Sequence, residues 1–488
     1  MTFHKFIKRY KPLLWFFILI VIFLSCKTDS STPENNGLPR ELIILYTNDE
    51  HGWLEPGGRY GGAAGMTGKW RNTEGYTDDG PYLILSGGDM WTGPAISTWT
   101  RGEAMIDVMN AMDYDAAAIG NHEFDFEIDV LYQRLEQADF PFLSANIRER
   151  ETGEIPGFAT PYIVKEVNGI QVGLIGLTTT SAPLTTFPDH VDDFDFIPYD
   201  TALEEIVPQA RAAGAELLIV IGHICRAEIL DLAPTAANLG IALIGGGHCH
   251  EQVNGTRNGV AYIQAGSEMK HYARVDISFD TATDTVISLN SGIYENSGST
   301  PDPEIEEVVS YWQSEVSDEL SRVIGYAAQE IPLGSPAMFN MVTDSWLIRF
   351  PSAQISLTNT GGIRQSIPAG EITVGTLVGV LPFENNIIQV ELTGTQLIEC
   401  VDDLVVGGMT MLGGYLLADG TPIEPGTVYS VLTIDYLYSR SDYCFQFYDP
   451  EPYDTSIHYR QPVIDWIESL NTSAADPLDN YLDNTSRR

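Results

Sequence analysis

The chain has 488 residues, more than one ordinary domain, and so predicts two domains. An apolar content of 44% is that of a packed globular protein and argues against a disordered chain. The formal net charge of −41 argues against a nucleic-acid-binding protein, because such proteins need a basic surface. An anionic substrate would have to be attracted by locally placed cations, such as bound metal ions or a few arginines.

The first 25 residues have the pattern of an export signal. Basic residues precede an apolar run at 13–24, which is too short to span a bilayer comfortably. The run ends in Ser25-Cys26, which resembles a bacterial lipoprotein processing site, so we expect Cys26 to carry a lipid. Simple secretion and an uncleaved anchor are the alternatives. Residues 26–40 are rich in Ser, Thr, Pro and Asn and indicate a flexible tether. We therefore expect an exported protein on the bacterial cell envelope, periplasmic or at the surface, that contacts the membrane only through this lipid.

Four further cysteines, Cys225, Cys249, Cys400 and Cys444, lie far apart in the sequence. Their spacing shows no disulfide framework, despite the exported location that the N-terminus predicts. Cys249 lies between two histidines, so it could be a metal ligand. The alternative is that Cys249 points into the core while its neighbours face a site, because side chains alternate near a strand end.

Residues 41–300 alternate between apolar runs and helical patterns, which predicts an α/β domain. The runs contain few polar residues, and such runs are typical of strands covered on both faces. Helical patterns lie between several of them, so we expect layered sheets with helices outside. The apolar runs are 42–46, 82–85, 116–119, 172–177, 217–221 and 241–244.

Residues 301–324 predict a helix that connects two domains. Asp302 can cap this helix, Pro303 suits its first turn, and apolar residues recur on one face. A second, smaller α/β domain is expected over residues 325–470. The polar tail, 471–488, is expected to be loose.

Asp, His and Asn side chains follow several of the predicted strands, at the positions where ligands collect in α/β folds. They provide the mixed oxygen and nitrogen ligands that suit Zn, Mn or similar divalent ions, and one carboxylate can bridge two such ions. Any one of these histidines alone could be a core residue with its hydrogen bonds satisfied. Five of the nine histidines lie in such positions, which is more than we expect by chance. This pattern predicts a two-metal site. The stretches are Asp49-Glu50-His51, Gly88-Asp89, Gly120-Asn121-His122-Glu123-Phe124-Asp125, Gly222-His223 and Gly247-His248-Cys249-His250.

The order of these motifs resembles the calcineurin-like metallophosphoesterases. The Phe124-Asp125 continuation and a glycine-rich loop at 359–364 narrow the resemblance to the bacterial 5′-nucleotidase/UDP-sugar hydrolase family. The resemblance covers nearly all of residues 41–470 and is looser in the second half. It implies a layered α/β-sandwich metallophosphoesterase domain, a connecting helix and a 5′-nucleotidase C-terminal domain that binds substrate. It also implies two divalent metal ions, one held by Asp49, His51 and His250, the other by Asn121, His223 and His248, with Asp89 as the bridge.

The resemblance implies a different role for His122, which would lie over the scissile phosphate and be held by Asp125. A positioned imidazole can stabilise the transition state or protonate the leaving oxygen. Because these two residues accompany a complete set of ligands, they favour catalysis over simple ligand capture.

In the family the second domain holds the nucleoside. Residues 359–364 resemble the usual Asn-Gly-Gly-Gly-Ile-Arg loop, which makes Asn359 and Arg364 substrate contacts. Residues 381–385 match Leu-Pro-Phe-x-Asn, so Phe383 would form one face of a base sandwich and Asn385 a polar contact. The resemblance also assigns Tyr436 as the second face and Asp442 as a further contact, and ordinary core packing is the alternative for both aromatic rings.

Three departures from the family pattern concern substrate specificity rather than metal chemistry. Residues 335–340 contain no arginine where relatives carry one. The usual Gly-Gly-Asp-Gly around Asp442 is replaced by Arg440-Ser441-Asp442-Tyr443, in which Arg440 could supply a substitute cation. The insertion at 413–426 is short.

These observations leave three functional hypotheses. The first is an exported, metal-dependent phosphohydrolase that acts on 5′-nucleotides. The second keeps the metal chemistry but changes the substrate to nucleotide sugars, 2′,3′-cyclic nucleotides or another phosphoester. The third is a lipoprotein that captures a ligand without catalysis.

Overall fold

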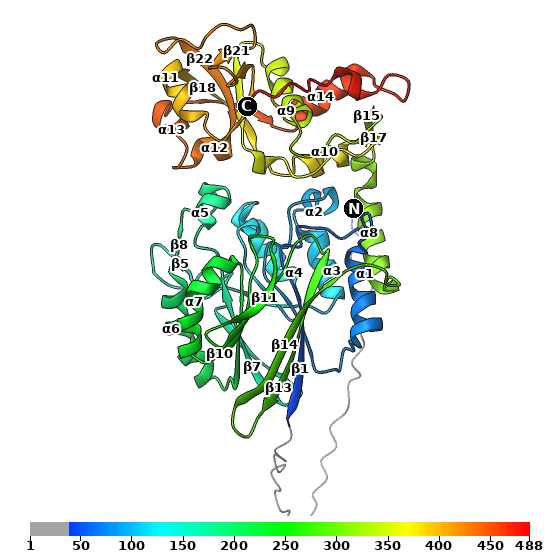
Figure 1. Cartoon of the computed structure of the whole chain (residues 1–488), viewed down its shortest axis with the longest axis vertical. Coiled ribbons are helices and arrows are strands. Elements are labelled where there is room, and N and C mark those ends of the chain that lie inside the picture. Colours follow the sequence, from blue (N-terminus) through cyan, green and yellow to red (C-terminus); the bar gives the residue numbers. More distant parts are fainter. Residues whose placement is uncertain (1–38) are drawn as a thin grey trace, which may run out of the picture. The chain divides into compact units, whose positions relative to one another are not determined.

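The computed structural model describes residues 39–488 (Figure 1). The predicted export signal, the lipidation site Cys26 and nearly all of the predicted tether lie outside these residues. Among the residues that are described, no helix is both long and apolar enough to cross a bilayer.

Two six-stranded sheets form the first domain and confirm the predicted layered α/β class. In the first sheet β1 to β4 run parallel, with the antiparallel strands β13 and β14 added at one edge. Its strands, in spatial order, are β14 (Thr285–Glu295), β13 (His271–Asp280), β1 (Arg40–Thr47), β2 (Tyr82–Ser86), β3 (Ala116–Ala118) and β4 (Phe142–Leu143).

The second sheet has a parallel centre, β12-β10-β9-β7, and an antiparallel strand at each edge. Its strands, in spatial order, are β11 (Gln252–Arg257), β12 (Val260–Ala265), β10 (Ile241–Gly245), β9 (Leu217–Gly222), β7 (Ile170–Leu177) and β6 (Tyr162–Val167). A separate antiparallel pair, β5 (Ile147–Glu149) and β8 (Phe194–Phe196), lies outside both sheets.

The two sheets pack face to face. One cluster of buried hydrophobic side chains contains residues from both sheets, among them the fully buried Ile44, Leu85, Val172 and Ile219. The continuous apolar runs of the sequence are thus explained, because the opposite face of each sheet is covered by helices. Helices α6 (Tyr199–Ala212) and α7 (Arg226–Asn238) pack on the second sheet. On the first sheet lie α1 (Gly62–Lys69), α3 (Glu103–Ala111) and α4 (Ile128–Gln137), together with the short helix α2 (Ala95–Trp99). The short helix α5 (Ala182–Thr185) lies in the chain segment that follows β7 of the second sheet.

The predicted connecting helix is present as α8 (Pro303–Leu320). The side chain of Asp302 accepts hydrogen bonds from the backbone N–H groups of Glu304 and Ile305, as expected of an N-cap. The buried face of helix α8 carries Ile305, Val309, Trp312, Val316 and Leu320.

The second domain is built on one five-stranded sheet. In spatial order its strands are β19 (Val405–Gly407), β16 (Ile355–Thr358), β22 (Val428–Ile434), β18 (Asn386–Thr393) and β23 (Tyr453–His458). Two strand pairs lie apart from it, β15 (Val323–Ala327) with β17 (Gly370–Thr373) and β20 (Met409–Thr410) with β21 (Leu416–Leu417). The helices are α9 (Pro336–Arg349), α10 (Val374–Val380), α11 (Gly394–Cys400), α12 (Asp435–Ser439), α13 (Phe445–Tyr448) and α14 (Gln461–Leu470).

The polar tail is held against the second domain, contrary to the expectation of a loose segment. Leu478 is fully buried, and the side-chain amide of Asn340 in α9 donates to the backbone oxygens of Asp483 and Thr485. Arg487 forms an ion pair with Asp344 of the same helix. The tail therefore finds partners on α9 that its own composition does not predict.

The four described cysteines form two disulfides, Cys225–Cys249 and Cys400–Cys444, with Cα–Cα distances of 5.3 and 5.6 Å. The expectation that they lack a disulfide framework is wrong. The partners are 24 and 44 residues apart in sequence, so no local spacing marks them and only the fold brings them together. Cys249 is exposed and bonded to Cys225, which contradicts both roles considered for it, metal ligand and core residue.

Candidate metal and substrate site

The carboxyl ends of β1, β2, β3, β9 and β10 carry the seven predicted metal ligands. These ends belong to both sheets of the sandwich, and the side chains that follow them converge. The structure thus brings together residues spread over two hundred positions of the sequence, as the strand-end pattern predicts.

One group consists of Asp49, His51 and His250, whose ligand atoms all lie within 4.8 Å of one another. The Nε2 atoms of His51 and His250 are 3.1 Å apart, and His250 Nε2 is 3.3 Å from Asp49 Oδ1. Three lone-pair donors at such spacing suit a divalent cation.

A second group consists of Asp89, His223 and His248, with ligand atoms again within 4.8 Å. His223 Nε2 is 2.9 Å from Asp89 Oδ2. The other ring nitrogen, Nδ1, donates to the backbone oxygen of Gly87 at 2.9 Å, which orients the ring and leaves Nε2 for a ligand role.

Asn121 completes the second group in the predicted set. Its side-chain N–H donates to the backbone oxygen of Thr185 at 3.0 Å, while its Oδ1 is buried and has no hydrogen-bond partner among the described residues. A buried amide oxygen without a partner is costly. This orphaned oxygen beside carboxylate and imidazole ligands fits a site for a divalent cation.

The backbone of five predicted ligands lies in the left-handed region. The φ angles are 51° at Asp49, 46° at His51, 58° at Asp89, 71° at His248 and 54° at His250. Non-glycine residues rarely adopt this conformation, which costs about 1–3 kcal/mol each and persists only where the surroundings impose it. Such strain is concentrated at functional sites and supports the ligand assignment independently of the side chains.

Glycine is required where the strand-end loops meet. A Cβ atom on Gly120 would lie 2.2 Å from Asp89 Oδ1, and one on Gly247 would lie 3.0 Å from His223 Nδ1. A larger residue at position 120 would push the loops after β2 and β3 apart, and one at position 247 would crowd the ring of His223.

His122 and Asp125 are hydrogen-bonded as predicted, with His122 Nδ1 donating to Asp125 Oδ2 at 2.7 Å. The backbone N–H of His122 donates to Asp89 Oδ1 at 2.8 Å, and its Nε2 is 4.0 Å from Asp89 Oδ2. Burial lowers the pKa of His122, but the charges of Asp125 and Asp89 outweigh it and the net shift is upward. His51, Asp89 and His122 also meet the distance condition of a metal group, so geometry alone does not separate the two roles of His122.

Two buried glutamates beside the ligands were missed in the sequence. The carboxylate of Glu123 accepts from the backbone N–H groups of Asp89 at 2.9 Å, Met90 at 2.8 Å and Gly120 at 2.6 Å, so it joins the loops after β2 and β3. Burial raises its pKa to about 7. Glu50 accepts from Thr47 and Ser86, and burial raises its pKa to about 8. In the sequence, only the position of Glu50 and Glu123 inside the predicted ligand motifs indicates that they lie at the site.

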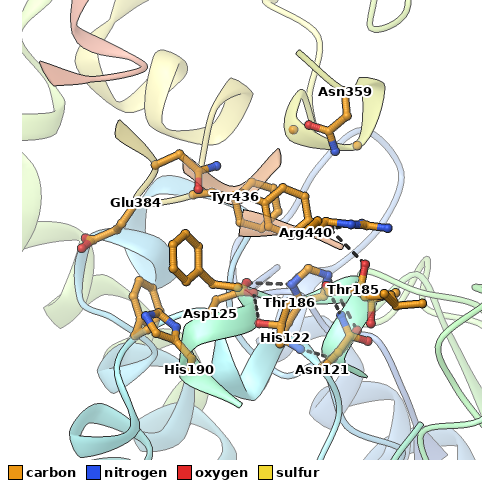
Figure 2. Close-up of a pocket in the computed structure, with 18 of the residues that line it drawn as sticks. Asn121, His122, Asp125, Thr185, Thr186, His190, Asn359, Glu384, Tyr436 and Arg440 are labelled. Atoms are coloured by element: carbon orange, nitrogen blue, oxygen red, sulfur yellow. Dashed lines mark hydrogen bonds and ion pairs between the residues drawn. The ribbon is translucent and has the colours of Figure 1, made fainter. Parts of the chain in front are cut away.

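A cavity of about 390 Å³ extends from the ligands to residues of the second domain (Figure 2). Arg440 lines this cavity. Five of the six predicted substrate residues line it as well, namely Asn359, Arg364, Phe383, Asn385 and Tyr436. The structure does not bring Asp442 into this wall. The guanidinium of Arg440 binds the Asp442 carboxylate instead, through Nε at 2.8 Å and through Nη2.

The two predicted base-stacking aromatics both face the cavity. The ring of Phe383 stacks on that of His122, with centroids 5.8 Å apart and planes inclined by 23°, and the guanidinium of Arg364 lies 5.9 Å from its centroid. The hydroxyl of Tyr436 donates to the backbone oxygen of Leu184 at 3.2 Å and accepts from Arg440 Nη1 at 2.5 Å. Each ring thus bounds the cavity as well as packing on the core.

The first domain adds a wall that no sequence motif marks. It includes Thr185, Thr186 and His190 (Figure 2). Thr186 Oγ1 donates to Asp125 Oδ1 at 3.3 Å, and His190 Nδ1 donates to the backbone oxygen of Phe124 at 2.7 Å. These loop residues also hold Asp125 and its neighbour in place.

Residues 323–416 match the model of the 5′-nucleotidase C-terminal domain. The chain is 26% identical over 400 residues to endonuclease YhcR of Bacillus subtilis, which covers 73% of this chain but only 32% of that protein. It is 28% identical over 415 residues to a 5′-nucleotidase of Vibrio cholerae, covering 74% of each. The structure of a 5′-nucleotidase precursor from Thermus thermophilus matches with a TM-score of 0.77 at 24% identity, over 92% of this chain and 98% of that chain, which shows a shared fold.

Proposed function

The chain belongs to the 5′-nucleotidase family, and from this premise we propose that it is a metal-dependent phosphoric-ester hydrolase that releases phosphate from 5′-nucleotides. One observation carries the proposal. Two groups of potential metal ligands and the His122–Asp125 pair lie at one end of a cavity whose other walls carry two aromatic rings and two guanidinium groups.

We assign two divalent ions to the ligand groups, with zinc and manganese as the leading candidates. Asp49, His51 and His250 would hold one and Asn121, His223 and His248 the other, with Asp89 shared between them. When bound, such ions polarise phosphoryl oxygens and acidify water. The unpartnered Asn121 Oδ1 and the Nε2 of His223, which lies 2.9 Å from Asp89 Oδ2, are the atoms that best support this assignment.

His122 acts on the phosphoryl group in this proposal. Its Nδ1–H is committed to Asp125, so Nε2 is the atom available to the substrate. The neighbouring carboxylates favour the protonated imidazolium, which can neutralise developing negative charge or give its proton to the leaving oxygen. The His122 ring lies between Asp89 and Phe383. A phosphate attached to a nucleoside whose base stacks on Phe383 would therefore lie next to this ring.

Phe383 and Tyr436 would hold the base, since each presents an aromatic ring to the cavity. Stacking of a base on such a ring contributes about 1–3 kcal/mol. Arg364 would contact the phosphate as a fixed planar cation, with Asn359 and Asn385 as polar contacts. Asp442 stays a predicted contact that would need to leave Arg440 to reach the substrate.

The charges of the cavity favour a substrate with one phosphate. Among the residues described here that line it, Arg364 is the guanidinium without a carboxylate partner, whereas Arg440 is bound by Asp442. Asp435 adds negative charge to the wall, and Glu127 and Glu384 share a single cation, Arg101, so the wall stays acidic. A nucleotide sugar or a nucleoside triphosphate carries more than one phosphate. Among the described residues of the cavity wall, no second arginine without a carboxylate partner is present to bind the additional charge.

We place the protein outside the cytoplasm, anchored through Cys26. The export pattern of the first 25 residues supports this, and so do the two disulfides, because disulfides persist in oxidising compartments.

A substrate panel tests the proposal. Purified protein is assayed with AMP, UDP-glucose, 2′,3′-cyclic AMP and an aryl phosphate, with and without a chelator. We expect AMP to give the highest kcat/KM, the chelator to abolish turnover, and added metal to restore it. Preference for UDP-glucose or the cyclic nucleotide would favour the second hypothesis, and no turnover by metal-loaded protein would favour a ligand-capture lipoprotein.

A further inference from the structure

The Cys225–Cys249 disulfide connects the two loops that follow β9 and β10, and these loops carry three proposed ligands. Cys225 lies two residues after His223, and Cys249 lies between His248 and His250. We propose that this disulfide is a positioning element of the metal site, which holds His248 and His250 in ligand geometry and thereby sets the metal affinity. The inference rests on the proposed function, because it takes these histidines to be ligands.

The loop after β9 is a firm anchor. Cys225 stands at the N-cap of α7, where its backbone N–H donates to Glu228 at 2.9 Å and its carbonyl accepts from Ile229 at 3.0 Å. The backbone N–H of His223 donates to Leu177 of the neighbouring strand β7 at 2.8 Å. The intervening Ile224 is fully buried. A group bonded to Cys225 is therefore tied to the sheet and to a 13-residue helix.

The loop after β10 is held on its inner side by hydrogen bonds. The buried amide of Gln264 donates to the backbone oxygens of Ile224 at 2.8 Å and Gly247 at 3.0 Å. The backbone N–H of Gly247 donates to Ile224 at 3.1 Å. These contacts fix the loop as far as Gly247, just before the first histidine.

The outer half of the same loop is different. His248 and His250 have φ angles of 71° and 54°, in the left-handed region that these residues otherwise avoid. Cys249 is exposed, and the side chain of His250 is 38% exposed. The backbone N–H of His248 donates to the Asp49 carboxylate at 3.0 Å, and that of Cys249 donates to the backbone oxygen of Gly247 at 2.8 Å. The bond to Cys225 adds a covalent restraint to these hydrogen bonds and opposes relaxation of the loop toward ordinary backbone angles.

The effect on metal binding follows from the position of the bond. Groups that orient metal ligands without touching the metal change metal affinity about 10–100-fold when they are removed. The disulfide orients two ligands of different proposed ions, because His250 belongs to the first group and His248 to the second. We expect its loss to weaken both.

The test uses the full chain with Cys225→Ser and Cys249→Ser together. Metal-depleted protein is titrated with Zn²⁺ and Mn²⁺ by calorimetry, without substrate. We expect about 10–100-fold weaker binding than in the wild type, and a kcat that recovers toward the wild-type value at saturating metal.

The second disulfide supplies a matched control. The Cys400→Ser, Cys444→Ser variant also loses one disulfide, from the second domain and across a longer separation, 44 residues against 24. It should lower thermal stability yet leave metal affinity unchanged. Equal metal affinity in the wild type and the Cys225/Cys249 variant, or an equal loss in the control, would overturn the proposal.

Reduction of the wild type covers the case in which the variant does not fold. Because Cys249 is exposed, a phosphine reductant can open the bond in folded protein, and the reductant is then removed under anaerobic conditions. Metal affinity should fall and should return on reoxidation; unchanged affinity of the reduced, folded protein overturns the proposal. Bound metal without nucleotide hydrolysis would defeat the proposed function alone, and a wild type that binds no divalent metal would defeat both.

Discussion

At the scale of single residues, the surroundings of His122 suit either of two roles, proton transfer or metal binding. Its Nδ1 is bound to Asp125 and its backbone to Asp89, so the ring is fixed between the ligand groups and Phe383. Asp125 is held in turn by Thr186. A ring fixed in this way suits proton transfer, whereas its Nε2 remains close enough to Asp89 to compete for a ligand role.

We expect His122→Ala to reduce kcat about 10²–10⁴-fold, the usual contribution of a general acid. Metal content, measured on the same preparation by elemental analysis, should stay near that of the wild type. His271→Ala, which removes a half-buried histidine of β13 outside the cavity, is the control and should change neither quantity. Metal loss that parallels the loss of turnover would make His122 a ligand.

Glu123 provides a second prediction at this scale. Its carboxylate accepts three backbone N–H groups from two ligand loops. In Glu123→Gln one accepting oxygen becomes an NH₂ group that faces these donors, so we expect the free energy of unfolding to fall by about 1–3 kcal/mol. Urea denaturation measures the change. Glu136→Gln, an exposed position in α4, should stay within about 0.5 kcal/mol of the wild type.

At the scale of elements, the strand ends of the first domain and the loops of the second contribute different parts of the site. The ligand loops are short and follow buried strands, so their chemistry is visible in the sequence. The loop before β18 contributes Phe383, which meets His122 from the other domain. Arg101 of the first domain and Glu384 of this loop form an ion pair at 2.7 Å, which adds a polar contact beside the ring.

Phe383→Ala should raise KM for AMP more than KM for an aryl phosphate, because only the nucleotide would lose a base-stacking partner. A loss of about 1–3 kcal/mol corresponds to a rise of roughly 5- to 150-fold. Steady-state kinetics on both substrates gives the ratio. Phe447→Ala removes an aromatic ring that is 82% exposed and serves as the control. If both KM values rise by the same factor, Phe383 does not contact the base.

At the scale of the whole molecule, metal binding should contribute to stability. The ligand groups place Asp49 and Asp89 among imidazoles in a buried site, where a bound cation would satisfy the orphaned Asn121 oxygen. A ligand that binds only the folded state stabilises it by about 2.7 kcal/mol at 100 times its Kd.

We therefore expect a chelator to lower the Tm of the wild type, and added Zn²⁺ or Mn²⁺ to restore it, as measured by differential scanning calorimetry. Asp89→Ala removes the carboxylate proposed to be shared by both ions, so its Tm should respond less to the chelator than the Tm of the wild type. A chelator that leaves the Tm of the wild type unchanged would speak against a tightly held metal.

Most of the fold, and the gathering of the predicted ligand residues at one end of the sheets, could be predicted from the sequence, because both depend on local patterns. Apolar runs of strand length marked the sheets, and a glycine next to Asp or His marked most of the strand ends. Asp302 and the apolar face of α8 likewise predicted the connecting helix within a few residues. The same reasoning could not foresee the docked tail or the two disulfides, whose partners have no spacing that sets them apart.

The sequence by itself determined which chemical groups are present and on which strand ends they lie, since a strand and the turn after it are local. Only the tertiary structure decided which groups meet. It joined Cys225 to Cys249, bound Asp442 to Arg440, and placed the Glu123 carboxylate among backbone N–H groups of two loops. The tertiary structure also imposed the left-handed backbone conformation of five predicted ligands. The physical reason is that packing between distant segments imposes these contacts and conformations, against the preferences of the residues themselves.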